Sequence, residues 1–370
     1  MSSVFLNQPW LESSLADNLV ASAQQFSNNI KPQAQPCKSS DDAYNIGCFF
    51  PVAGTKVRLA QRINRIVSSY LPSCNDSFAD CLLILASTSQ AIQEIEEEVT
   101  QEKNFNSTHV YKLDLFAETV KKAWGFSSAI SLNTACTSAA NALIYGARLV
   151  KEKVYKKVLV IAYETPSELA LQGFGSLGLN SLSGQYRPFH PERDGLILGE
   201  AYAATLLTQE KNTSSYAKLL GGGSGCDTSN MTSTLVDGSH IHATAELALE
   251  EARVKAEQIN LIKHHGTGTD NNDLAEAAAL ERIFPTTSPA SCCLKPWLGH
   301  TLGACGLAEV ALMMYCISNN LPLPALDYAV KALTPLPAFP LELAPGSLVL
   351  ANFSGFGGNN ASLVLQGVEQ

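Results

Sequence analysis

The chain has 370 residues, of which 46% are hydrophobic and 16% charged, and its formal net charge is −9. This composition is typical of a globular protein with one large or two fused α/β cores. The acidic balance argues against general nucleic-acid binding and gives no reason to expect an anionic membrane as partner. The first 17 residues carry two acidic side chains and no basic cluster before an apolar stretch, so they do not read as a signal peptide.

The longest nearly apolar stretch, residues 298–317, contains His300, Glu309 and several glycines. A buried helix explains it better than a membrane span. The ten cysteines include no CxxC pair, and most lie in apolar surroundings. This pattern predicts reduced thiols in a cytoplasmic protein, with neither disulfides nor a metal site.

Residues 1–47 are polar and predict an irregular, loop-rich segment. After them, helical patterns alternate with short apolar strands, which predicts a layered α/β architecture of two similar halves, 1–205 and 206–370. The glycine run 221–225 lacks a Gly-Lys-Ser/Thr sequence and is predicted to be a turn, not a phosphate loop. The predicted helices are 57–67, 91–99, 113–124, 243–256, 273–283 and those that follow residues 136 and 300; the predicted strands are 81–86, 129–132, 158–162, 201–207, 217–221, 261–263, 347–352 and 361–366.

Cys136 lies where the predicted strand 129–132 turns into a helix of small residues. Unpaired backbone N–H groups and the helix dipole favour an anion at such a turn. A thiolate near neutral pH is therefore expected, and the thiolate is the nucleophilic form of cysteine. The alternative is an inert buried cysteine that acts as a small hydrophobe.

Two histidine runs lie far downstream. His264 and His265 follow the predicted strand 261–263 in Lys-His-His-Gly-Thr-Gly-Thr, a loop that suits an imidazole close to a ligand. Strand alternation sends the two side chains to opposite sides. This run also has a plain structural interpretation, as a turn with a hydrogen-bonded histidine.

The second run places His300 at the start of a helix of small residues, with Glu309 about two and a half turns later. A buried glutamate requires a partner, and Lys295 or a neighbouring backbone group is the candidate. The final run, Asn352 to Ala361, contains Phe356 and Gly357 among glycines. It either places a backbone N–H beside a reacting carbonyl or forms a glycine-rich hairpin.

Together, in this order, the four runs closely resemble the β-ketoacyl-acyl-carrier-protein synthases of the thiolase superfamily, of the elongating type. The resemblance covers roughly residues 50–368 and includes the run from Tyr186 to Gly195 with Leu198-Gly199-Glu200, the segment Asp227 to Thr232, and Asp273 with Glu276. It implies a thiolase-like fold of alternating helix and sheet layers (α-β-α-β-α). It also implies a dimer, and it implies substrates carried on the phosphopantetheine of an acyl carrier protein, with no nicotinamide, flavin or metal.

The resemblance also implies roles for the residues. Cys136 would carry an acyl chain as a thioester. His265, which directly precedes the motif glycine, would act with His300 on a malonyl thioester carbonyl and stabilise the enolate left by loss of carbon dioxide. Lys295 and Glu309 would tune His300. The amides of Cys136 and Phe356 would form a second oxyanion site, with Phe356 and Gly357 at the gate to the acyl pocket.

A helix face with Arg58, Arg62 and Arg65 is a candidate docking site for an acidic carrier protein; a solvated helix face explains it equally well. The chain departs from the family in its N-terminal region, which lacks a Thr-Gly-x-Gly turn, and at Ala201, where the family commonly has glycine. One alternative is a chain-length-factor-like subunit of a heterodimeric synthase, with a faint likeness to aryl-polyene pathway synthases. A thiolase-type acyltransferase is less favoured because residues 352–361 contain no second cysteine. Chain length, and fatty-acid or polyketide metabolism, stay open.

Overall fold

The protein is described here by a computed structural model, in residues 3–38, 45–53, 57–100, 114–232, 234–286, 289–326, 328–329, 334–335 and 340–369. The helices are α1 Leu19–Ser27, α2 Leu59–Tyr70, α3 Ile92–Thr100, α4 Leu115–Trp124, α5 Ser138–Lys151, α6 Glu168–Ser176, α7 Ser239–Ala252, α8 Asp270–Ile283, α9 Lys295–Leu298 and α10 Cys305–Ser318, with short 3-10 helices η1 Pro72–Cys74, η2 Ala256–Gln258, η3 Leu302–Ala304 and η4 Phe356–Gly358. The strands are β1 Val4–Glu12, β2 Gln35–Lys38, β3 Asn45–Phe50, β4 Cys81–Ala86, β5 Ser128–Leu132, β6 Lys157–Glu164, β7 Leu198–Gly199, β8 Ala201–Thr208, β9 Ser215–Cys226, β10 Leu261–Lys263, β11 Ala290–Cys292, β12 Tyr328–Ala329, β13 Thr334–Pro335, β14 Leu348–Gly355 and β15 Asn359–Gly367.

The main sheet has the strand order β11-β10-β14-β15-β9-β1-β8-β6-β4-β5. Its two ends are parallel, β10 with β11 and β14, and β4 with β5 and β6. Between them, β1 pairs antiparallel with both β8 and β9. The N-terminal strand therefore joins the two halves of the sheet.

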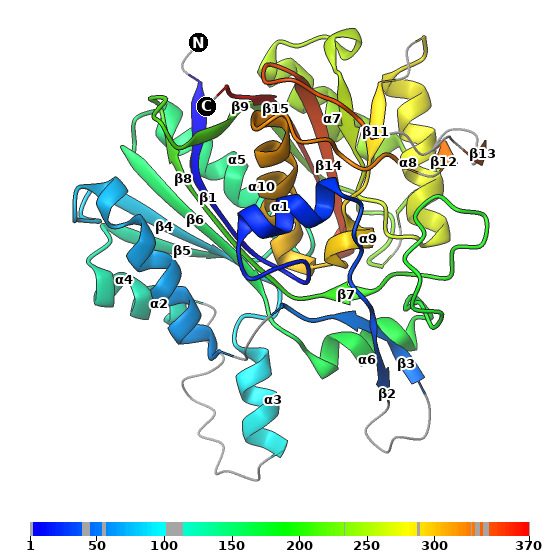
Figure 1. The fold of residues 1–370 in the computed structure, drawn as a ribbon, viewed down its shortest axis with the longest axis horizontal. Coiled ribbons are helices and arrows are strands. Elements are labelled where there is room, and N and C mark those ends of the chain that lie inside the picture. Colours follow the sequence, from blue (N-terminus) through cyan, green and yellow to red (C-terminus); the bar gives the residue numbers. More distant parts are fainter. Residues whose placement is uncertain are drawn as a thin grey trace.

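Two central helices separate those halves. α5 contacts β4, β6 and β8 on one side and β9 and β15 on the other, and α10 contacts β8, β1, β9 and β15. Figure 1 shows both helices between the β6–β8–β1 side and the β14–β15 side of the sheet. Gly306 permits the close crossing of α10 on α5, because a Cβ there would lie 2.3 Å from Ala140 N.

The outer faces are covered by helices as well. In β4, Leu82, Ile84 and Ala86 pack into the central core, whereas Leu83 and Leu85 pack into a second core that includes residues of α2 and α4. This alternation follows from the two-residue period of a strand buried on both faces. On the other half, α7 packs on β9, β15 and β14, and α8 packs on α7. The predicted order of helix, sheet, helix, sheet and helix is confirmed.

The expectation of an irregular segment over residues 1–47 is wrong. Val4–Glu12 is β1, in the middle of the main sheet, and Leu19–Ser27 is α1, which packs on α10. The strand escaped prediction because its polar residues find buried partners. Asn7, for example, donates from Nδ2 to Leu206 O (2.9 Å) and Thr208 Oγ1 (2.9 Å).

The glycine run 221–225 is not a turn, as predicted, but the second half of β9. Its glycines leave room for helices on both faces of the strand. A Cβ on Gly223 would lie 2.1 Å from Thr244 O in α7, and a Cβ on Gly222 would lie 2.5 Å from Ile144 Cγ1 in α5. The lack of side chains at this point therefore sets the distance between sheet and helices.

The other predicted helices and strands occur within a few residues of their expected bounds, with Leu113 outside the described residues. The prediction also omitted β2, β3, α6, β7, α9, β11, β12 and β13. The division into halves at residue 205 stays a prediction; that residue lies within β8.

Candidate active site

Cys136 lies in the expected turn between β5 and α5. The preceding residue, Ala135, has a φ of +51°, a left-handed conformation that is unfavourable for an L-residue by roughly 1–2 kcal/mol. Two backbone hydrogen bonds close the turn, from Thr137 N to Thr134 O (3.2 Å) and from Ser138 N to Ala135 O (3.1 Å). The sharp turn places the thiol two residues before α5, directly before its N-cap, Thr137.

Cys136, His265 and His300 line the same cavity, which has a volume of about 540 Å³. Their exposed fractions are 5%, 2% and 2%, respectively. The imidazole rings of His265 and His300 meet edge to face, with centroids 5.1 Å apart. Three side chains that are remote in sequence therefore converge, nearly buried, in one cavity that opens to the surface.

The loop after β10 holds His265 in place. The carboxylate of Glu276 in α8 accepts hydrogen bonds from His265 N and Gly266 N, each at 2.6 Å. His264 is fully buried and does not line the cavity; its ring packs edge to face on Phe189 at 5.1 Å. The two side chains thus diverge as strand alternation predicted.

The backbone of His300 is fixed to the segment around β7: its N–H donates to Ile197 O (2.7 Å), and its carbonyl accepts from Gly199 N (3.0 Å). The next turn, η3, is held by a buried carboxylate that the sequence analysis missed. Glu164 accepts from Gly303 N (2.8 Å) and Thr88 N (3.0 Å). Nothing in the local sequence marks Glu164 except its charge at the end of an apolar strand.

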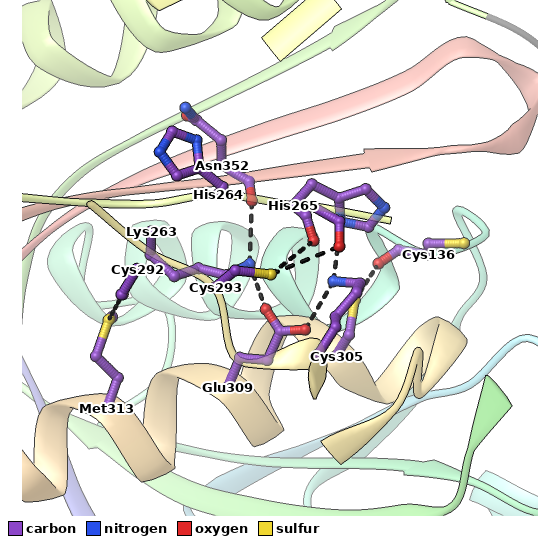
Figure 2. A network of polar contacts seen from close by, with 12 residues as sticks. Cys136, Lys263, His264, His265, Cys292, Cys293, Cys305, Glu309, Met313 and Asn352 are labelled. Atoms are coloured by element: carbon purple, nitrogen blue, oxygen red, sulfur yellow. Dashed lines mark hydrogen bonds and ion pairs between the residues drawn. The ribbon is translucent and has the colours of Figure 1, made fainter. Parts of the chain in front are cut away.

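A buried charge network lies behind the histidines (Figure 2). Lys295 Nζ lies 2.8 Å from Glu309 Oε1 and 3.3 Å from His265 Nδ1. Lys295 was therefore correctly expected to pair with Glu309, but its direct contact is with His265 and not with His300. The network also includes Lys263, which forms an ion pair with Glu309 Oε2 and to which the sequence analysis gave no role.

Burial lowers the pKa of both His265 and His300 well below the ordinary value of 6.5, and the positive charges of Lys295 and Lys263 lower both further. Burial also lowers the pKa of Lys295, but the carboxylate of Glu309 more than offsets it, and the net shift is upward. The site therefore holds neutral imidazoles beside a charged ammonium group.

The expected thiolate near neutral pH is wrong for the free protein. Burial raises the pKa of Cys136 to about 12, although the charge of Lys295 and the N–H of Phe356 act in the opposite direction. Desolvation outweighs the effect of the helix N-terminus, because Cys136 is nearly inaccessible to solvent.

Phe356 lies opposite Cys136 in η4. Its N–H points to the sulfur of Cys136, and its ring stacks on Phe174 with centroids 5.1 Å apart. Gly357 has a φ of +73° and donates its N–H to Met231 O (2.7 Å). Of this predicted pair, only the amide of Phe356 faces the sulfur.

The three arginines proposed for carrier docking do not share an exposed face. Arg62 is 3% exposed and pairs with buried Glu12 (3.2 Å), and its guanidinium lies over the Tyr202 ring at 4.1 Å. Arg65 also contacts Glu12, at 2.6 Å, with half of its side chain exposed. Arg58 precedes α2 and is exposed. The docking role is therefore wrong for Arg62, which is part of the core.

The family comparison agrees with this geometry. Residues 86–213 match the model for the N-terminal domain of β-ketoacyl synthases, and residues 216–329 match the model for their C-terminal domain. The chain belongs to the β-ketoacyl synthase family.

Three similar proteins illustrate the relationship. The ketoacyl synthase alpha subunit of the tetracenomycin polyketide synthase of Streptomyces glaucescens is 29% identical over 255 residues, 63% of this chain and 59% of that protein. The 3-oxoacyl-[acyl-carrier-protein] synthase 2 of Rhizobium meliloti is 29% identical over 259 residues, 64% of this chain and 60% of that protein. A solved ketosynthase in complex with its chain length factor, from Xenorhabdus doucetiae, superposes with a TM-score of 0.83 at 25% identity, covering 99% of this chain and 98% of that one. The chain spans about 60% of the length of the curated relatives.

The described residues contain neither a candidate membrane span nor a candidate metal site. No helix there has the length and apolar character needed to cross a membrane. Within the same residues, no group of three or more His, Cys, Asp or Glu side chains is arranged to bind a metal ion.

Proposed function

We propose that the protein is a 3-oxoacyl-[acyl-carrier-protein] synthase that catalyses a decarboxylative Claisen condensation. The observation that carries this proposal is the convergence of Cys136, His265 and His300 in one cavity. The cavity encloses a nucleophile and two neutral ring donors, which is what acyl transfer followed by carbanion formation requires.

In the first half-reaction, the sulfur of Cys136 attacks the carbonyl carbon of an acyl thioester on the carrier. The new carbon–sulfur bond forms as the carrier's bond breaks, and the thiol proton of Cys136 leaves with the carrier thiolate. Negative charge develops on the carbonyl oxygen during this step. The N–H groups of Cys136 and Phe356, which both act on the sulfur, would donate to it.

In the second half-reaction, a malonyl thioester places its carbonyl oxygen between His265 and His300. The bond to its carboxylate breaks, carbon dioxide leaves, and the electron pair forms an enolate. The enolate carbon then attacks the acyl carbonyl on Cys136, the carbon–sulfur bond breaks with its electron pair on the sulfur, and a 3-oxoacyl product leaves on the carrier. The released thiolate takes up a proton from water and returns to the thiol. Neutral imidazoles are well suited to donate hydrogen bonds to the enolate oxygen in a water-poor cavity.

The partners belong to the same proposal: an acyl carrier protein whose phosphopantetheine presents both substrates, and a second synthase-like subunit. Arg58 and Arg65 stay candidates for carrier docking. β5 lies at the edge of the main sheet with Ile130 43% exposed, which supports pairing of two subunits along that edge. The chemistry uses thiol, imidazole and amide groups of the chain itself.

The test is incubation with an acyl-carrier substrate, then with malonyl-carrier protein, followed by intact-mass analysis of the protein and of the carrier. We expect an acyl adduct on the native protein, none on Cys136→Ala, and a 3-oxoacyl carrier only from the native protein. Cys226→Ala is the matched control, since Cys226 is an exposed free thiol. Condensation by Cys136→Ala would overturn the mechanism.

A second candidate is a chain-length-factor-like subunit that works only with a partner synthase. The similarity to a ketosynthase solved in complex with its chain length factor supports it, whereas the presence of Cys136, His265, His300 and Lys295 weighs against it. Condensation that requires a second synthase-like subunit, and that survives Cys136→Ala in this chain, would favour it. An aryl-polyene, other polyketide or fatty-acid pathway stays a prediction that only a panel of acyl substrates resolves.

A further inference from the structure

Lys263 is a buried charge to which the proposed mechanism gives no role. It is the last residue of β10, has no exposed surface, and pairs in register with Cys292 of β11 and Ala351 of β14. A buried ammonium group is strongly unfavourable unless it is paired and hydrogen-bonded. Its environment therefore has to explain its presence.

The contacts of Lys263 are specific. Its Nζ forms an ion pair with Glu309 Oε2, donates to Asn352 O at 3.1 Å, and lies 3.6 Å from the centroid of the Phe353 ring. Figure 2 shows Lys263 and Glu309 reaching toward each other from β10 and from α10. The ammonium group is thus held by a carboxylate, a carbonyl and an aromatic face.

Glu309 serves two ammonium groups at once. Its Oε1 accepts from Lys295, whose Nζ lies 3.3 Å from His265 Nδ1, while its Oε2 contacts Lys263. All three side chains are fully buried. Two positive charges against one negative charge leave this trio with a surplus of one positive charge behind the cavity.

We propose that Lys263 is a positioning residue of this site: it clamps Glu309 so that Lys295 stays against His265, and its charge makes the histidine end of the cavity favour an anion. The inference rests on the proposed function for the identity of that anion, which is the carboxylate of a malonyl-type thioester and then the enolate. A Glu309–Lys295 pair without Lys263 would leave one carboxylate oxygen of Glu309 unclamped and would carry no surplus charge.

Other groups face the same region and belong to the electrostatic balance. Glu276 binds the backbone of His265 and Gly266, and Asp273 binds the backbone of Gly268 and Phe189, so both carboxylates lie along the loop after β10. The neighbouring thiols stay neutral because burial raises the pKa of each; they are Cys292, Cys293 and Cys305. Burial lowers the pKa of both histidines, and the positive charge of Lys263 lowers the pKa of each further.

The experiment compares Lys263→Met, Lys263→Gln and Lys263→Arg with the native protein. Lys156→Met is the control, since Lys156 is 80% exposed and pairs only with an exposed aspartate. One readout is the pH profile of malonyl-carrier decarboxylation. The second is the titration of His265 and His300 by NMR of protein labelled with ¹³C in its histidines, assigned with His→Gln variants. Acyl loading of Cys136 reports that each variant is folded.

In Lys263→Met and Lys263→Gln, we expect the acidic limb of the pH profile and the titration midpoints of both histidines to move upward by on the order of one pH unit. Removal of one buried unit charge has an effect of this size at an effective dielectric constant near 20. On this acidic limb, decarboxylation by the Met and Gln variants falls several-fold at a given pH, whereas Arg and the Lys156 control leave the limb in place. The inference is overturned if Lys263→Met and Lys263→Gln leave the acidic limb and the histidine titrations unchanged. It is also overturned if Lys263→Arg moves them as far as Lys263→Met does. A Gln variant that behaves as the native protein would show that only the hydrogen bond to Asn352 matters.

The two proposals fail in different ways. If the native protein neither loads an acyl group nor decarboxylates a malonyl thioester, the proposed function fails, while the NMR titration still tests Lys263. If the native protein does both and the Lys263 variants keep its pH profile, only the inference about Lys263 fails.

Discussion

The loop that carries His265 depends on a single buried carboxylate, and replacing it has a calculable effect. Glu276 accepts from His265 N and Gly266 N at 2.6 Å each and from Asn272 Nδ2 at 3.0 Å. In Glu276→Gln, the amide keeps one oxygen acceptor and turns its NH₂ toward one of the two backbone N–H groups. One charge-assisted hydrogen bond, roughly 1.5–3 kcal/mol, is lost and a buried N–H loses its acceptor, so we expect a destabilisation of about 2–4 kcal/mol.

The assay is thermal unfolding monitored by circular dichroism, together with malonyl-thioester decarboxylation. The unfolding entropy of a chain of this length is roughly 0.8 kcal/mol/K, so the expected fall in melting temperature is about 3–5 °C. The matched control is Glu251→Gln: Glu251 also accepts a backbone N–H, from Gly222 at 3.2 Å, but is partly exposed. Water can replace that lost contact, so we expect a fall of about 1 °C or less.

In Glu276→Gln, the rate of decarboxylation should fall even at temperatures where the variant stays folded. The reason is that a small displacement of His265 removes a hydrogen-bond donor from the enolate oxygen. The reasoning would be refuted by equal melting temperatures for the Glu276 variant and the native protein, or by equal falls for the two glutamine variants. Either result would mean that burial of the carboxylate does not fix the loop.

Two further predictions concern pH and docking. The pKa values of His265 and His300 are depressed in the folded state, so their contribution to stability is complete above the unfolded pKa near 6.5 and is lost as pH falls below it. Urea unfolding at pH 7.0, 6.0 and 5.5 should show the free energy of unfolding falling by up to about 2.7 kcal/mol per pH unit. A free energy that does not change with pH would contradict buried neutral histidines. Arg58→Glu should raise the KM for carrier-bound substrate several-fold and leave a small acyl-thioester mimic unaffected, with Lys156→Glu as the control; equal effects on both substrates would remove Arg58 from the docking surface.

The residues of the site were predicted from the sequence better than the strands and helices around them. Cys136 and His265 each follow a strand, and His300 lies in the turn between α9 and η3. Such positions are recognisable from glycines and small residues nearby. β1 was missed because polar residues and a proline interrupt its apolar residues, and the partners of those polar groups are remote in sequence; Asn7 finds its acceptors in Leu206 and Thr208. The glycines of β9 were misread for a related reason, since their function is to admit helices that are remote in sequence.

The charged residues behind the site show more clearly what could not be predicted from the sequence. Glu309 was expected to need a partner, and Lys295 was named, because both lie in one run. Lys263 and Glu164 come from other strands, and only the folded chain shows that their charges meet Glu309 and the backbone of η3. Proximity in sequence therefore suggests ion pairs between successive elements, such as Lys295 in α9 and Glu309 in α10, but not those that depend on the order of strands in the sheet.

The protonation states in the cavity follow from burial more than from residue identity. The same removal of water that raises the pKa of Cys136 to about 12 also lowers the pKa of both histidines. A thiol that stays protonated at rest is protected from side reactions, and it becomes a nucleophile only when a thioester brings an acceptor for its proton. Neutral imidazoles, in turn, offer a donor without an added full charge. On an exposed surface the same three residues would titrate near their ordinary values, with the histidines partly charged at pH 6. The burial of these three side chains, at the turn before α5, in the loop after β10 and in the α9–η3 turn, is thus itself a part of the chemistry.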